Sequence, residues 1–413
     1  MTSRRRAADA AGASRLWLPF TQMREFDRRA RTFVRGDGPW LIDANGNRVF
    51  DAVSSIWTII HGHGHPRIVE AIARQAATLD HATLLGASHP LAETLAQRLC
   101  ELTETDYAFF SGDGASAIEV ALKIALQYWR QRGEMHRRRF VRLTDAYHGD
   151  TAGAMSVSDI AVFKRHFDAV TFTAHPYDAD PAVFDAPDVA AVVVEPIVQA
   201  AAGMRLVPED RYAPLRRRTA LLIVDEIATG FGRTGTMFAS ERLNLRPDIV
   251  CVGKGLSGGV LPISATLVRA HVYEAFLGDF GEMRQLFHGH SFAGNPIACA
   301  AALASLDLFE EEETLAHVAM LVAAMQPRLE RLASHPAVRE VRVLGTMAGI
   351  ELRAEALDRG DAPTPAWRVA NGLYRRGHFT RPIGEVIQFV PPLSSPPELV
   401  DAFFDALEDE LAA

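Results

Sequence analysis

Two short apolar runs most tightly limit how this chain can fold: ALLIV at residues 220–224 and DIVCV at residues 248–252. Each run is too short for a typical helix, and its apolar character is typical of a strand buried on both faces of a parallel sheet. Asp225 and Glu226 follow the first run, and Lys254 follows the second. Because the carboxyl ends of neighbouring parallel strands face one crevice, we expect Asp225 and Lys254 to meet around one small molecule.

Lysine usage singles out Lys254. The chain has 43 lysine and arginine residues, and only Lys123, Lys164 and Lys254 are lysines. A guanidinium stays protonated, whereas a lysine amine can lose its proton and form a Schiff base with an aldehyde. A lone lysine is more often a solvated surface charge, and that alternative suits Lys123 and Lys164. Lys254 instead ends a strand between Gly253 and Gly255, which let a backbone or a flat ligand approach closely.

Length, charge and cysteine usage restrict the class of protein. A chain of 413 residues with a net charge of -8 favours a soluble globular protein without a nucleic-acid surface. It has no apolar run of the roughly 18 residues that a membrane span requires. Its three cysteines lack metal-site spacing and suit a reducing, cytoplasmic compartment. Residues 1–14 lack the apolar core of a secretory signal, so we expect a frayed tail, with a transit peptide as the alternative.

Alternating strand and helix patterns predict the fold class. Between residues 62 and 315 they indicate an α/β domain with a large, doubly wound, mostly parallel sheet. Residues 1–61 begin with the tail and then show short strands, including a hairpin at Asn45-Gly46. Residues 316–413 contain helical and strand-like patterns. We expect these two segments to pack together as a smaller α+β domain.

A glycine-rich turn from a strand into a helix lies at residues 112–116. The helical pattern that follows places its apolar residues on one face. Such a turn exposes unpaired N–H groups at the positive end of the helix dipole, which suits a phosphate. The glycine spacing matches neither the dinucleotide fingerprint nor the nucleoside-triphosphate loop, which argues against both ligands.

Three histidines, His61, His63 and His65, alternate in the segment before the first long helix. A zinc site would need further ligands and a closed geometry that nothing nearby supplies. We therefore expect a loop here and no metal site.

Five predicted strands deliver polar or aromatic groups to one sheet edge: residues 111–116, Tyr147, Glu195, Asp225 and Lys254. A phosphate cradle, an aromatic ring, a carboxylate and a deprotonatable lysine together fit pyridoxal 5'-phosphate. In this interpretation Lys254 binds the aldehyde and moves a proton at the substrate carbon. Asp225 keeps the ring nitrogen protonated, which makes the ring an electron sink.

Four motifs resemble the class III, fold-type I pyridoxal-phosphate aminotransferases over nearly the whole chain: IVDEIATGFGRTG, VGKGLSGG, YHGDT and HGHSFAGNP. The resemblance implies a homodimer with two active sites, each completed by the partner subunit. Five further segments are similar to the branch that aminates 8-amino-7-oxononanoate in biotin synthesis: SSIWTIIHGHGHP, ALQYW, GAMSV, EPIVQ and TRPIGEVIQFVPP.

The resemblance also assigns roles to individual residues of the cofactor site. It implies that Gly114 and Ala115 cradle the phosphate and that Tyr147 lies beside the ring and the substrate. Asp225 matches the acid at the ring nitrogen, and Lys254 matches the Schiff-base lysine.

A second set of matched residues concerns the partner subunit and the substrate. Gly289, His290 and Ser291 match the loop that reaches across the dimer to the phosphate. Arg381 matches the residue that binds the carboxylate of the keto acid, which suits a bidentate guanidinium. The alternative for Arg381 is a surface arginine before a proline.

Several positions depart from the family pattern. Phe20 replaces a tyrosine that aids substrate recognition, and Ile56 stands where a tryptophan often lines the substrate tunnel, with Trp57 after it. His290 and Ser291 replace a Pro-Thr pair, and serine keeps the hydroxyl. The sequence leaves the amino donor open between S-adenosylmethionine and lysine.

Besides a 2,1-aminomutase, which is possible on this fold but gains no support from the segment around Arg381, three other functions compete with this interpretation. One is an ω-amino acid or diamine aminotransferase that uses pyruvate or 2-oxoglutarate. Another is a non-catalytic protein with the same fold, which retention of Lys254, Asp225 and Tyr147 disfavours. The third, a nicotinamide oxidoreductase, fails on the glycine spacing and leaves Lys254 without a role.

Overall fold

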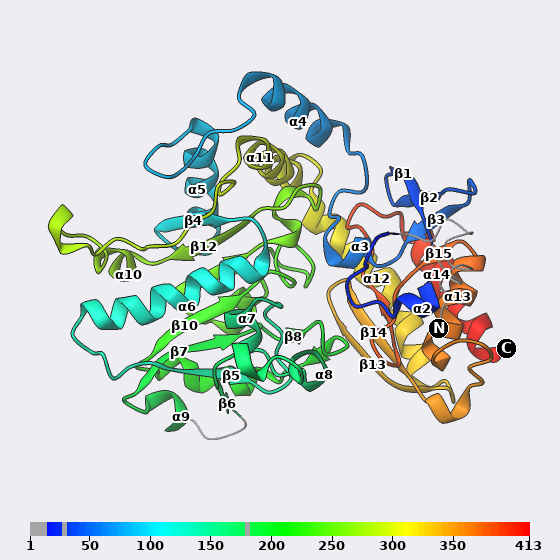
Figure 1. Ribbon diagram of the computed structural model, residues 1–413. Helices are drawn as coiled ribbons and strands as arrows, with labels where there is room; N and C mark the ends of the chain where they lie inside the picture. The colour runs from blue at the N-terminus through cyan, green and yellow to red at the C-terminus, as the bar shows by residue number, and fades with distance from the viewer. Residues whose placement is uncertain (1–14, 27–30, 178–181) are drawn as a thin grey trace, which may run out of the picture.

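The computed structural model describes residues 15–26, 31–177 and 182–413. A large unit surrounds one broad sheet, and a smaller unit lies beside it (Figure 1). The predicted tail at residues 1–14 lies outside the described residues. In the described part of the chain, no helix is long and apolar enough to cross a membrane.

The large unit is built on a mixed sheet in which all neighbouring strands run parallel except where β12 takes part. The two apolar runs form adjacent parallel strands, with Ile223 beside Ile249 and Val224 beside Val250. This confirms the predicted doubly wound, mostly parallel sheet. In spatial order its strands are β4 (Tyr107–Ser111), β12 (Ser264–Val268), β11 (Ile249–Val252), β10 (Leu221–Asp225), β7 (Val189–Val194), β5 (Arg139–Leu143) and β6 (His175–Tyr177).

Both faces of this sheet are buried, because alternate side chains of its central strands enter different apolar clusters. Leu221 and Ile223 pack with helix α6, whereas Leu222 and Val224 pack on the opposite side. The helices of the large unit are α4 (Pro66–Thr78), α5 (Pro90–Thr103), α6 (Gly114–Gln131), α7 (Ala152–Val157), α8 (Ala161–Lys164), α9 (Ala182–Asp185), α10 (Ala270–Glu274) and α11 (Pro296–Glu311). Two short strands, β8 (Val198–Gln199) and β9 (Arg205–Leu206), pair beside it.

Short 3-10 helices and turns connect these elements. They are η1 (Asp168–Val170), η2 (Glu209–Arg217), η3 (Ala239–Leu243), η4 (Lys254–Ser257), η5 (Phe280–Glu282) and η6 (Ala354–Ala356). Near the chain start lies the short helix α2 (Met23–Phe26). The segment α3 (Ser54–Trp57) is a left-handed turn, in which all four residues have φ between 48° and 66°.

The small unit joins the two ends of the chain. Strand β3 pairs in parallel with β15, with Phe50 beside His378. The predicted hairpin at Asn45-Gly46 is confirmed, because β2 and β3 are antiparallel neighbours. The small unit contains two sheets. One consists of β1 (Phe33–Asp37), β2 (Trp40–Asp43), β3 (Arg48–Asp51) and β15 (His378–Phe379), and the other of β13 (Val338–Leu344), β14 (Met347–Leu352) and β16 (Val386–Phe389).

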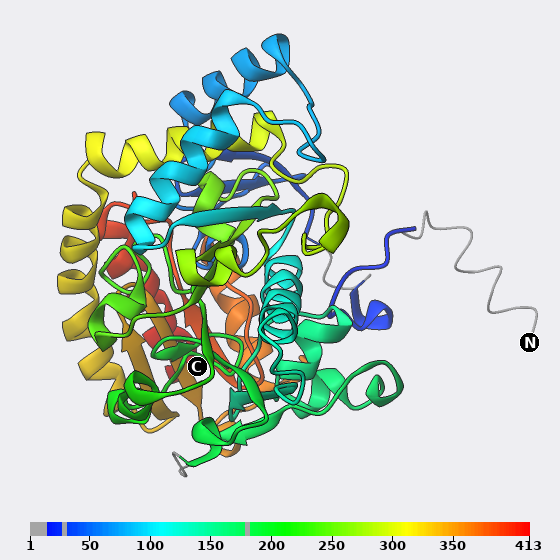
Figure 2. The same ribbon diagram turned by 90° about the vertical axis from the view of Figure 1, so that its left-hand side faces the viewer.

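Three helices cover these two sheets: α12 (Thr314–Ala333), α13 (Pro365–Arg375) and α14 (Pro397–Ala412). In the turned view of Figure 2, the gold helix α12 runs along the left edge of the molecule and the teal helix α6 stands near its middle. The predicted domain boundaries at 61/62 and 315/316 stay a prediction.

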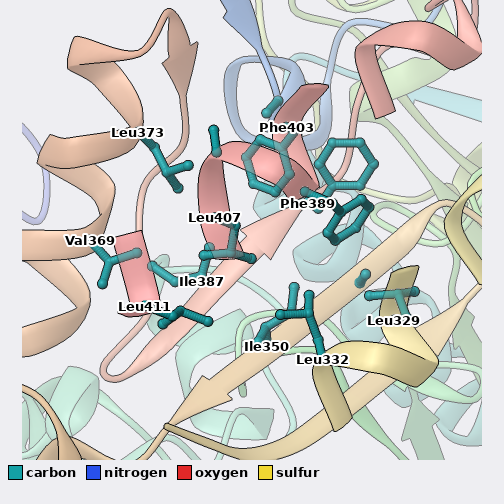
Figure 3. Packing of buried hydrophobic residues seen from close by; sticks show 14 of the residues in the cluster. Leu329, Leu332, Ile350, Val369, Leu373, Ile387, Phe389, Phe403, Leu407 and Leu411 are labelled. Carbon is teal, nitrogen blue, oxygen red and sulfur yellow. The ribbon is translucent and has the colours of Figure 1, made fainter. Parts of the chain in front are cut away.

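The core of the small unit is built mainly from apolar side chains. Phe389, Phe403, Leu407, Ile350 and Ile387 are among its fully buried members and point toward one another (Figure 3). Full burial of such a side chain contributes about 1.5–3 kcal/mol, so this core holds the N-terminal and C-terminal segments together.

Candidate active site

The carboxyl ends of five strands surround one cavity of ≈ 510 Å³ beside the small unit. Tyr147, Glu195, Asp225 and Lys254 line it, together with the first turn of α6. The prediction that these strands deliver their groups to one place is therefore confirmed. Order along the chain does not bring them together; the parallel pairing of β5, β7, β10 and β11 does.

Lys254 lies two residues beyond the end of β11, after Gly253, and opens the turn η4 with a left-handed φ of 38°. This conformation is strained for a residue with a side chain, and such strain gathers at functional sites. Burial lowers the pKa of the Lys254 amine, although the charges of Asp225 and Glu195 act in the opposite direction. The amine nitrogen lies 5.4 Å from the centre of the Trp57 ring. A lowered pKa increases the fraction of Lys254 that is in the neutral, nucleophilic amine form.

The glycines beside Lys254 serve the packing of the protein itself. A side-chain carbon at Gly255 would lie 2.9 Å from a methyl group of Ile60 and 3.1 Å from Phe231. At Gly253 the nearest atom, 3.4 Å away, belongs to Ile227. The sequence predicted that a backbone or a flat ligand would approach these glycines closely. At Gly255 the groups that approach are Ile60 and Phe231.

Asp225 ends β10 and is buried against His148. One carboxylate oxygen lies 2.7 Å from His148 Nδ1, and the other accepts the Ile227 N–H at 3.0 Å. The far ring nitrogen of His148, Nε2, has no hydrogen-bond partner among the described residues. The motif YHGDT contains His148, but no local pattern predicts that this residue orients Asp225, which is 77 residues away.

Tyr147 and Glu195 form a second buried contact. The Tyr147 N–H donates to Glu195 at 2.9 Å, and the Tyr147 hydroxyl donates to Asp150 at 2.7 Å. Burial raises the pKa of Tyr147, and the hydrogen bond to Asp150 raises it further. Burial also holds the pKa of Glu195 well above its ordinary value, and the nearby charge of Asp225 adds to this effect. The sequence placed Glu195 at this edge without a chemical role and did not single out Asp150.

The amino end of α6 presents free N–H groups to the cavity. Asp113 caps this helix, accepting the Ser116 N–H at 3.0 Å. In the described chain, no protein acceptor takes the N–H of Gly114 or Ala115. A side-chain carbon at Gly114 would lie 2.8 Å from Ile227, so only glycine fits there without a shift. These groups fit the phosphate of the cofactor predicted from the sequence.

Six predicted site residues do not line this cavity: Phe20, Ile56, Gly289, His290, Ser291 and Arg381. Phe20 reaches the site through aromatic contacts, because its ring centre lies 5.0 Å from that of Phe163, which lies 5.8 Å from that of Tyr147. Ile56 is 38% exposed on the left-handed turn, and Trp57 takes the place in the cavity wall.

Gly289 and His290 line a separate cavity of ≈ 460 Å³ with Leu85 and Phe109. The His290 ring packs against the turn at Gly112. A side-chain carbon at Gly112 would lie 3.4 Å from this ring. Ser291 is exposed.

Arg381 precedes β16, and its guanidinium donates to the backbone oxygen of Phe20 at 3.1 Å. Burial lowers the pKa of Arg381. No carboxylate forms an ion pair with it anywhere in the described chain. A partly buried guanidinium without an acidic partner suits a carboxylate that arrives with a ligand.

The three histidines of the α3–α4 segment each have a different partner. His61 contacts Ser305, His63 lies 2.9 Å from Asp51, and His65 lies 3.1 Å from Glu312. Across the described residues, no three His, Cys, Asp or Glu side chains gather in a way that could hold a metal ion.

Comparison with known proteins gives one consistent family. Residues 23–411 match the family model described as aminotransferase class-III. The adenosylmethionine-8-amino-7-oxononanoate aminotransferase of Anoxybacillus flavithermus is 39% identical, over 96% of this chain and 94% of that protein.

Solved structures agree with this result. The crystal structure of adenosylmethionine-8-amino-7-oxononanoate aminotransferase from Methanocaldococcus jannaschii has a TM-score of 0.89 at 37% identity, covering 98% of this chain and 99% of that chain. An amine transaminase from an uncultivated Pseudomonas species, in its PLP-bound form, has a TM-score of 0.87 at 33% identity, covering 97% and 98%.

Proposed function

The chain belongs to the class III aminotransferases, and from this premise we propose that it converts 8-amino-7-oxononanoate to 7,8-diaminononanoate in biotin synthesis. The cofactor we propose is pyridoxal 5'-phosphate. One observation carries the proposal: Lys254 and Asp225 line a single cavity that also receives the free N–H groups of Gly114 and Ala115. We further propose that the protein acts in the cytoplasm, which suits its three buried, unpaired cysteines.

The first turn of α6 and Asp225 would hold the two ends of the cofactor. Gly114 and Ala115 would donate to its phosphate, and the dipole of an 18-residue helix favours that negative charge. Asp225 would accept a hydrogen bond from the protonated ring nitrogen, while His148 fixes the orientation of its carboxylate. When bound, the cofactor supplies an aldehyde that carries the amino group and a ring that withdraws electrons from the substrate carbon.

Lys254 and Tyr147 would handle protons around the reacting carbon. Burial favours the neutral form of Lys254, and a neutral amine can take a proton from the substrate and return it. Tyr147 stays protonated because its pKa is raised, so its hydroxyl remains a neutral hydrogen-bond donor held by Asp150.

The keto acid would extend from the cavity toward Arg381. Its carboxylate would pair with the guanidinium, which lacks an acidic partner among the described side chains. Trp57 and Tyr147 would contact its aliphatic chain from the cavity wall, and Phe20 and Ile56 would border its entrance.

We also propose a homodimer in which each subunit completes the other's site. Gly289, His290 and Ser291 would reach the phosphate of the partner's cofactor. In support, they lie outside the cavity of their own chain, and Ser291 offers an exposed hydroxyl.

Two half-reactions test this function. Purified protein loaded with pyridoxal phosphate is mixed with S-adenosylmethionine or with lysine, and the visible absorbance of the bound cofactor is followed. We expect one donor to bleach this absorbance and 8-amino-7-oxononanoate to restore it; S-adenosylmethionine is the donor in the names of the relatives. Lys254→Ala is the control, and it should respond to neither donor.

The same measurement identifies the main alternative. If pyruvate or 2-oxoglutarate restores the absorbance and 8-amino-7-oxononanoate does not, the protein is an ω-amino acid or diamine aminotransferase. The similarity to an amine transaminase gives this alternative its weight.

A further inference from the structure

Gln388 lies between the cavity and the residue that would bind the keto acid's carboxylate. It belongs to β16, and only 1% of its surface is exposed. Its side-chain oxygen accepts the indole N–H of Trp57 at 2.8 Å. Its side-chain N–H₂ donates to the backbone oxygen of Arg381. One buried amide therefore joins two residues that are 324 positions apart in the chain (381 minus 57).

Among the described residues, each end of this link has few other side-chain hydrogen bonds: the indole N–H of Trp57 donates to Gln388. Trp57 ends the left-handed turn α3, a conformation that disfavours residues with side chains. Arg381 lies in the loop before β16, and its guanidinium has one hydrogen bond within the described chain, to the backbone of Phe20. The amide of Gln388 thus supplies a fixed bond to each.

We propose that Gln388 is a positioning residue that sets the distance between the Trp57 wall of the cavity and Arg381, and so the length of keto acid that fits. This inference rests on the proposed function. A glutamine suits the task because it donates and accepts at once, which a carboxylate or an apolar side chain of the same size does not do. If Arg381 shifts, a long substrate with a terminal carboxylate loses its anchor while the chemistry at Lys254 is retained.

The test variant is Gln388→Met, which keeps the side-chain volume and removes both bonds. We expect the KM for 8-amino-7-oxononanoate to rise roughly 5- to 30-fold, the range that loss of one or two buried hydrogen bonds produces. The KM for the amino donor and kcat should change by less than about threefold, because Lys254 and Asp225 are untouched.

Gln388→Glu is a second variant for the case in which Gln388→Met does not fold. It keeps an acceptor for the Trp57 N–H, and its carboxylate does not donate to Arg381. We expect a smaller rise in the same KM.

Gln199→Met is the matched control. Gln199 is also 1% exposed, and its amide donates to a backbone oxygen, that of Thr144, at 2.7 Å. Since none of the described hydrogen bonds of Gln199 involves Trp57 or Arg381, this variant should not raise the keto-acid KM selectively.

Coupling to Arg381 separates positioning from general damage. In an Arg381→Ala background, Gln388→Met should add less than about twofold to the KM, because the group it positions is gone. The inference is overturned if Gln388→Met leaves the keto-acid KM unchanged, raises both KM values equally, or keeps its full effect in that background. An inactive wild type would instead refute the proposed function itself.

Discussion

The active-site edge of the large sheet and the core of the small unit are both shielded from water, but they bury different groups. The edge holds Asp225, Glu195 and His148 as buried polar residues, next to a lysine with a strained backbone. The core around Phe389 and Phe403 consists of apolar side chains (Figure 3). Burial of apolar surface stabilises a fold, whereas burial of ionisable groups costs stability and shifts their pKa values toward catalytic use. Mutations in the two regions should therefore affect different measurements.

The largest expected effect is on activity, at Asp225. Asp225→Asn keeps the shape and an acceptor for the Ile227 N–H, but its neutral amide does not hold a proton on the cofactor ring. Loss of a buried charge partner costs about 3–5 kcal/mol, which corresponds to roughly 10²- to 10⁴-fold in kcat if it acts in the transition state. The thermal unfolding of the cofactor-free protein should change little.

Asp248→Asn is the matched control for Asp225→Asn. Asp248 precedes the neighbouring strand and pairs with Arg218 at 2.6 Å, away from the cavity. Its substitution should lower stability with little effect on kcat. If Asp225→Asn and Asp248→Asn lose the same activity, Asp225 has no special catalytic role at the active-site edge of the large sheet.

Asp225, Lys254 and the turn at Gly114 share a property: each lies at or just beyond the end of an apolar run, or opens a helix. Asp225, Lys254 and the turn at Gly114 could be located because strand ends and helix starts have local signals. The partners of these residues have no such signal. His148 contacts Asp225, and Gln388 contacts Trp57, only because of which strands lie side by side.

Side-chain direction was the other unpredictable quantity. Ile56 and Trp57 are consecutive, and the sequence did not decide which of them faces the cavity. The left-handed turn settles this in favour of Trp57, and a run of four left-handed residues has no recognisable sequence pattern here. The fold class was easier to predict, since alternating strand and helix patterns extend over the whole large unit.

In the core of the small unit, the expected effect is on stability. Phe403 is fully buried and contacts Phe389, with ring centres 4.6 Å apart. Phe403→Ala should lower the free energy of unfolding by about 3–5 kcal/mol through lost burial and a cavity. Denaturant titration measures this loss, and the folded fraction should keep a kcat close to that of the wild type.

Phe280→Ala supplies the control for Phe403→Ala. Phe280 is 92% exposed, so its loss should change the unfolding free energy by less than about 0.5 kcal/mol. If Phe280→Ala lowers kcat without changing the free energy of unfolding, or if the folded fraction of Phe403→Ala loses kcat, the core and the active-site edge are not separate in function.

The smallest expected effect concerns His378, the one point where an ionisable ring touches this aromatic core in the described structure. Its ring centre lies 5.7 Å from that of Phe403, and burial lowers its pKa from 6.5 to about 4. The unfolded chain therefore takes up a proton as the pH falls through 6.5, while the folded chain does so only near pH 4. Stability from this residue is complete above pH 6.5 and is lost between pH 6.5 and 4.

His378→Phe removes this titration and keeps a ring of similar size. We expect the acid-side loss of unfolding free energy to shrink by about 1–3 kcal/mol, since one pKa unit between folded and unfolded states is worth about 1.4 kcal/mol. Part of the loss should persist, because burial also lowers the pKa of His61 to about 4. Urea titrations at pH 7.5 and pH 5 measure the difference. If the unfolding free energy of His378→Phe depends on pH as in the wild type, the core of the small unit tolerates a charged ring. The core and the active-site edge would then differ less than the burial of His378 implies.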